Sequence, residues 1–254
     1  MGNEFAPPRS VVRTIWGDPH MVLLIFAGSA AEFALNRAVD WLFVTGSIPT
    51  DPLGRLFSTV NYAQRIIFAR VEDAGHTLAT ISTIHAAVER RRGQRIPDWA
   101  HRDVLYMLMD HSQRAYELLR APMSAAQQEE LYASFRQLGR GLSIPEIPAS
   151  FREWQQDRER HLQRDLVYSE FTARLFEKYR AQLGAWRYRI LLEVQALLVP
   201  NRVRELLGMR PNPLLIGSMP LYALLRDLGL LRLVECALVP QRYWSDVRKL
   251  QRSA

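Results

Sequence analysis

A single histidine within an apolar helical pattern is the first residue of this sequence that could do chemistry. His85 lies in the stretch TISTIHAAVERRRG, with Ile81 and Val88 three to four residues away. On a helix this spacing turns the imidazole toward the apolar side. His85 is therefore either a hydrogen-bonded core histidine or a metal or haem-iron ligand. One histidine among hydrophobic residues suits haem better than zinc, which needs three or four converging ligands.

Two further polar groups accompany this histidine in the sequence. Arg55 and Thr59, in RLFST, are one helical turn apart and share a face. They could contact a haem propionate and a bound ligand, or they are a surface arginine and a threonine that bonds back to the preceding turn. The basic run Arg90–Arg92 is a solvated helix end that favours the helix dipole, or it reaches a cofactor near His85.

The remaining candidates carry weaker signals. His111 is predicted on a polar helix face, and Tyr106 is predicted to line the core or a pocket. Four other histidines lie in polar or loop contexts and carry no prediction: His20, His76, His101 and His161. The sequence has no GxGxxG after a strand, no GxxxxGK[ST], no HExxH, no GxSxG and no paired ExxH. Common nucleotide, zinc-protease, serine-hydrolase and di-iron chemistry is therefore not indicated.

The elements that must position these residues are predicted to be helices throughout. The periodicity indicates an all-α fold, with a loose N-terminal arm over residues 1–19 and one helical domain over residues 20–254. Helices are expected over about 20–44, from 52, from 72, over 101–120 and over 124–140, followed by a polar helix containing QQDRERHLQRD. The last third reads as apolar helices broken at Pro200, Pro211, Pro213, Pro220 and Pro240.

Composition limits the compartment and the partners. The only cysteine, Cys236, excludes a disulfide framework and fits a reducing cytoplasm. The apolar run MVLLIFAGSAA is shorter than the ~20 residues needed to span a bilayer, so it is predicted to be a buried core helix. A net charge of +7 permits nucleic-acid binding, but no aromatic platform or helix-turn-helix supports it. Peripheral membrane association and the oligomeric state stay open.

The order of motifs resembles a known family. WGDPHMVLLIFAG, TDPLGRLFSTVNYAQRIIFA, TISTIHAAVE, DVLYMLMDHSQRAYELL and PMSAAQQEELYASFRQLG follow one another as in the catalytic domain of the mpaB and rubber-oxygenase family, which includes the latex-clearing proteins. VPNRVRELLGM and VPQRYWSDVR are similar to its closing segments, so the resemblance runs from about Arg13 to Arg248.

The resemblance implies a helical-bundle domain with a globin-like core that binds haem b. His85 matches the family's proximal haem ligand, and Arg55 and Thr59 match its R-x-x-x-T pair beside the haem. Characterised relatives use ferrous haem and dioxygen to cleave carbon–carbon double bonds of isoprenoid chains. Three positions depart from the family pattern: Leu35-Asn36 replaces a His-Pro pair, Ser58 replaces a lysine of the latex-clearing branch, and Tyr106 replaces a further histidine.

The sequence thus predicts a cytoplasmic, haem b-dependent oxygenase that acts on an apolar substrate of the isoprenoid or polyketide type. His85 is expected to ligate iron, Arg55 and Thr59 to contact the cofactor, and Tyr106 to donate a hydrogen bond near bound oxygen. The alternative is a non-catalytic helical module that carries or senses haem or an apolar ligand.

Overall fold

A computed structural model of the chain describes residues 3–39, 51–228 and 240–241, and within them every regular element is a helix. The helices are α1 (Val11–Trp16), α2 (Pro19–Phe33), α4 (Pro52–Ile67), α5 (Val71–Arg92), α6 (Asp98–Leu119), α7 (Ala125–Gly141), α8 (Phe151–Asp165), α9 (Glu170–Leu183), α10 (Ala185–Leu198), α11 (Asn201–Leu207) and α12 (Pro213–Asp227). The all-α prediction is confirmed for these residues. None of the helices among them combines the length and the apolar composition that crossing a bilayer requires.

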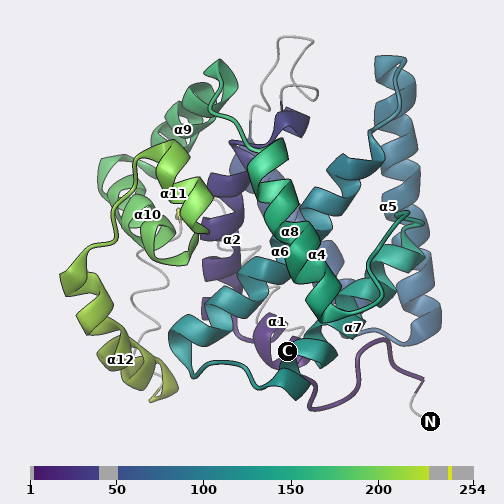
Figure 1. Cartoon of the computed structure of the whole chain (residues 1–254), viewed down its shortest axis with the longest axis horizontal. Coiled ribbons are helices and arrows are strands. Elements are labelled where there is room, and N and C mark those ends of the chain that lie inside the picture. Colours follow the sequence, from purple (N-terminus) through teal and green to yellow (C-terminus); the bar gives the residue numbers. More distant parts are fainter. Residues whose placement is uncertain (1–2, 40–50, 229–239, 242–254) are drawn as a thin grey trace.

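Helices α2 and α6 pack along each other at the centre of the molecule, as Figure 1 shows. Helix α2 is buried on nearly all sides because it carries no charged residue before Glu32. This confirms that MVLLIFAGSAA is a buried core helix. Helix α8 crosses α6, α4 and α5 lie on one side, and α9 to α12 lie on the other. The central pair therefore carries the side chains that meet in the interior.

Local capping explains where several helices begin. Asp18 accepts hydrogen bonds from the first backbone amides of α2 and precedes Pro19 at the first helical position. Asp51 and Pro52 start α4 in the same way. Ser124 and Gln127 form the predicted reciprocal capping box at the start of α7.

The N-terminal segment is not the loose arm that the sequence suggested. Ser10 caps helix α1, whose Val12, Ile15 and Trp16 are almost fully buried. The amide of Phe5 donates to the carbonyl of Ala69, which ties the segment ahead of α1 to the end of α4. Six residues are too few to show a clear apolar period, so the sequence pattern could not reveal this helix.

Two boundary predictions also need correction. Helix α2 ends at Phe33, so the helix predicted over about 20–44 is interrupted there; residues 37–39 are again helical, and residues 40–50 lie outside the described part of the chain. Pro220 does not break α12, because a proline removes one backbone hydrogen bond and the rest of this helix remains bonded. Pro200 and Pro213 do stand where α11 and α12 begin. Cys236 lies outside the described residues.

Candidate functional site

His85 lies on α5 beyond the part of the helix that packs on the core. The earlier turns of α5 bury Ala74 and Leu78, whereas His85 is half-buried. Its ring faces that of His101 at the start of α6, with the centroids 4.9 Å apart. Burial, and then the neighbouring His101, lower the pKa of His85, while Glu89 raises it. The neutral imidazole is therefore favoured, and no hydrogen bond reaches its ring nitrogens within the described part of the chain.

Arg55 and Thr59 lie on the exposed side of α4. The Thr59 hydroxyl donates to the Arg55 carbonyl at 3.1 Å, and the Ser58 hydroxyl donates to the Gly54 carbonyl at 3.0 Å. Both side chains thus bond to the preceding turn of their own helix, which is the local pattern expected of serine and threonine within helices. The guanidinium of Arg55 remains on the surface.

Tyr106 is fully buried on α6. Its hydroxyl donates to Oδ2 of Asp157 at 2.8 Å, and its ring contacts Trp154 and His161 edge-on. Burial and the bond to Asp157 raise the pKa of the phenol far above its usual value. Tyr106 is therefore a permanent hydrogen-bond donor that links α6 to α8.

A network of buried charges joins α2, α6 and α8. Arg158 donates to both carboxylate oxygens of Glu32, at 2.7 and 2.6 Å, and to Oδ2 of Asp110, at 2.9 and 3.1 Å. Arg114 pairs with the other oxygen of Asp110 at 2.8 Å. Burial alone would raise the pKa of Glu32, but Arg158 and His111 lower it to about 2. The network consequently stays ionised in the folded protein.

His111 completes this network and is fully buried, so the predicted polar position was wrong. Its Nε2 lies 3.1 Å from Oε2 of Glu32, which makes Nε2 the protonated nitrogen. Its other nitrogen, Nδ1, faces Gly28 and meets no donor within the described part of the chain. A Cβ at Gly28 would lie 2.3 Å from Nδ1, so the absence of a side chain at this position makes room for the ring.

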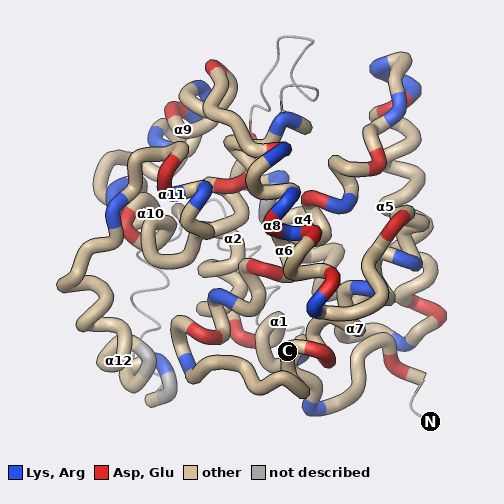
Figure 2. The backbone as a smooth tube through the Cα atoms, viewed as in Figure 1, with Lys and Arg blue, Asp and Glu red and all other residues tan. Residues whose placement is uncertain are grey.

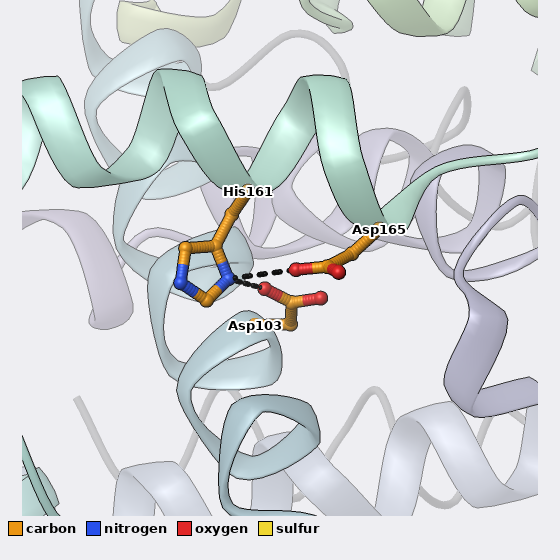
Figure 3. Close-up of side chains that lie close together, drawn as sticks. All are labelled: Asp103, His161 and Asp165. Atoms are coloured by element: carbon orange, nitrogen blue, oxygen red, sulfur yellow. Dashed lines mark hydrogen bonds and ion pairs between the residues drawn. The ribbon is translucent and has the colours of Figure 1, made fainter.

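A second buried group lies next to Tyr106 on the same two helices. Nδ1 of His161 contacts Oδ1 of Asp103 closely and lies 3.1 Å from Oδ2 of Asp165, as Figure 3 shows. The three side chains are buried, and their potential ligand atoms all lie within 4.8 Å of one another. Asn36 donates from its amide to the other oxygen of Asp103 at 2.8 Å. This is an arrangement that could hold a metal ion.

The members of these groups on α8, which are Arg158, His161 and Asp165, were missed because this helix reads as a polar helix. Acidic and basic residues are interspersed along it, as Figure 2 shows. A signal was nevertheless present, since the buried side chains recur at intervals of three and four residues: Phe151, Trp154, Arg158, His161 and Asp165. This spacing marks one helix face, and the aromatic residues at its start identify that face as the buried one.

A separate cavity of about 400 Å³ lies among α9, α10 and the end of α11. Its walls include Tyr168, Phe176 and Tyr188, with Glu193 and Arg210 as the charged members. The volume and the aromatic lining are typical of small-molecule sites. None of the residues predicted from the sequence lines it.

Comparison with known proteins decides the family. The catalytic domain described as "ER-bound oxygenase mpaB/B'/Rubber oxygenase" matches residues 14–225. The chain belongs to this family. A search of curated proteins finds no match.

Membership of the mpaB/rubber-oxygenase family supports a general oxygenase role, with a small-molecule substrate and dioxygen as the reactants. The matched residues include α2, α6 and α8, so both buried groups belong to the family domain. Asn36 and Tyr106 take part in these interactions.

Proposed function

We propose that the chain is a haem b-dependent oxygenase that acts on an apolar isoprenoid-like or polyketide-like substrate, by oxidative cleavage of a carbon–carbon double bond or a related oxygenation. The observation that carries the proposal is a neutral, half-buried imidazole at His85 within an oxygenase catalytic domain. The proposal includes a globin-like helical core around the haem and a cytoplasmic location.

The chemistry of His85 fits an iron ligand. A ligating histidine must offer a nitrogen lone pair, which requires a neutral imidazole with a nitrogen that is free of other bonds. Burial and His101 favour the neutral form, and no hydrogen bond among the described residues occupies either ring nitrogen.

The proposed roles of the other residues follow from their side chains. Arg55 would pair with a propionate, since a guanidinium binds carboxylates through two parallel hydrogen bonds. Thr59 would line the pocket with its methyl group while its hydroxyl bonds to the helix backbone. The Tyr106 hydroxyl would have to leave Asp157 to serve a bound molecule, so its role beside oxygen stays a prediction. When bound, haem supplies the redox chemistry toward dioxygen.

The test is to express the protein with a haem precursor and to record its visible spectrum. We expect wild type and His76→Ala to carry haem with the same axial ligation, because His76 is an exposed histidine on the same helix. We expect His85→Ala to lose haem or to change its ligation. A wild-type protein without haem, or an unchanged spectrum in His85→Ala, would contradict the proposal.

Catalysis is tested separately from haem binding. The haem-loaded protein is given a reductant, oxygen and a panel of isoprenoids, and the products are analysed for aldehydes and ketones. Carbonyl products that require both haem and His85 support the oxygenase. Bound haem without any product across the panel would favour the carrier or sensor.

A further inference from the structure

The group formed by Asp103, His161 and Asp165 does not include the proposed haem ligand His85. Asp103 comes from α6, and His161 and Asp165 lie one turn apart on α8. Each is at most 4% exposed, although aspartate is among the residues least often buried. Figure 3 shows both carboxylates directed at the same imidazole nitrogen, Nδ1.

Both carboxylates accept hydrogen bonds from residues outside the group. Asn36, just after α2, donates to Oδ2 of Asp103 and leaves Oδ1 directed at His161. Arg164 donates to both oxygens of Asp165, at 2.8 and 2.6 Å. Hydrogen bonds of this kind orient the ligands of metal sites and contribute to their affinity. Both carboxylates are therefore oriented by residues outside the group.

Carboxylates lie on both sides of the His161 ring, which favours binding of a cation where Asp103 and Asp165 meet. Asp157 lies on the other side of the ring, with Oδ2 3.6 Å from Nε2. A neutral imidazole has one N–H and would direct a lone pair at a carboxylate in either tautomer. Arg160 pairs with Asp157 and Arg164 pairs with Asp165, so among the described residues Asp103 is the carboxylate without an arginine partner.

We propose that Asp103, His161 and Asp165 bind one divalent transition-metal ion, such as Zn²⁺ or Mn²⁺, that joins α6 to α8. One imidazole nitrogen and two carboxylate oxygens form a donor set suited to these ions. The ion would take the place of the Nδ1 proton and would satisfy both carboxylates at once. Burial of all three ligands makes this a structural site, because little room remains for a substrate.

Chelator-treated protein prepared without haem tests the site. We expect Zn²⁺ to bind with a stoichiometry of one in calorimetry, and Co²⁺ to give a d–d absorption band as it occupies the same site. Asp103→Asn and Asp165→Asn should each weaken Zn²⁺ binding at least about tenfold. Zn²⁺ should also raise the melting temperature of wild type, since an ion that binds only the folded state stabilises it.

Two control variants make the result specific. Asp157→Asn, on the far side of the ring, and His85→Ala, on α5, should both retain Zn²⁺, so failure of the haem proposal leaves this one standing. If Asp103→Asn does not fold, Asp165→Asn at the last residue of α8 carries the test. No saturable binding to wild type, or undiminished binding to a folded Asp→Asn variant, would overturn the proposal and leave the three side chains as a hydrogen-bonded group that joins α6 to α8.

Discussion

Replacing Arg158 with methionine tests whether the buried charge network stabilises the fold. Methionine has a similar length and no charge, so Arg158→Met removes the hydrogen bonds to Glu32 and Asp110 without removing the bulk of the side chain. Both carboxylates would then be buried without their central cation. Asp110 would keep only its bond to the partly exposed Arg114.

The lowered pKa of Glu32 indicates how much stability Arg158→Met should lose. Burial raises the pKa of this carboxyl, but Arg158 and His111 bring it from the ordinary value of 4.5 down to about 2. That lowering corresponds to about 3 kcal/mol of stabilisation of the ionised form. Removing one member of a buried ion pair costs roughly 3–5 kcal/mol in other proteins. We therefore expect Arg158→Met to lower the free energy of unfolding by about 3–5 kcal/mol at pH 7.

The pH dependence distinguishes lost charge pairing from lost packing. In wild type the pKa of Glu32 is depressed, so its contribution is complete above pH 4.5 and is lost as the pH falls toward 2. In the variant, burial without Arg158 raises the pKa of Glu32, and protonation relieves the unpaired charge. The stability difference between the two proteins should therefore shrink as the pH falls from 7 to 5.

Urea unfolding followed by circular dichroism at pH 7 and pH 5 measures both quantities. The matched control is Arg160→Met on the same helix, whose exposed pair with Asp157 should contribute at most about 1 kcal/mol. A loss of less than 1 kcal/mol in Arg158→Met, or the same loss at both pH values, would refute the electrostatic reasoning.

The remaining predictions concern local packing and capping. Gly28→Ala should lower the free energy of unfolding by about 1–3 kcal/mol, because its Cβ would collide with the ring of His111. Gly75→Ala is the control on α5, where the space around the glycine is open, and it should be neutral or stabilising by up to about 1 kcal/mol. The melting temperatures of the two variants make the comparison, and equal values would contradict the packing of His111 against Gly28. Ser124→Ala should lower the free energy of unfolding by about 1 kcal/mol through loss of the bond to the Gln127 amide. Ser124→Asp, which can still accept that bond, should retain most of the stability in urea unfolding, and a loss equal to that of Ser124→Ala would exclude capping as the cause.

The sequence predicted helix starts correctly where the capping residues lie close together in the chain. Asp51-Pro52 and the Ser124 to Gln127 spacing are caps whose partners lie within three residues, so no knowledge of the fold is needed to recognise them. The apolar run in α2 likewise predicts burial whatever surrounds it. The short helix α1 was missed because its order depends on contacts with distant segments, such as the bond from Phe5 to Ala69.

The pairing of the buried charged residues could not be predicted from the sequence. His111 and Glu32 are 79 residues apart, and Arg158 is 126 residues from Glu32. A charged residue on a helix is exposed unless a partner of opposite charge is brought to it, and only the packing of α2, α6 and α8 supplies the partners. The three-and-four spacing in α8 could have indicated which face is buried, but not that the charges on it would be paired.

The sequence by itself determined that the chain is helical, where most of its helices begin, and the order of motifs that points to an oxygenase family. These properties depend on neighbours a few residues away, through the helical period and the caps. Only the tertiary structure decided that Tyr106 donates to Asp157, that His111 is buried against Gly28, and that Asp103, His161 and Asp165 converge. The reason is physical: the ionisation and the burial of a side chain depend on the groups that surround it in space, and in this fold those groups come from helices far apart in the sequence.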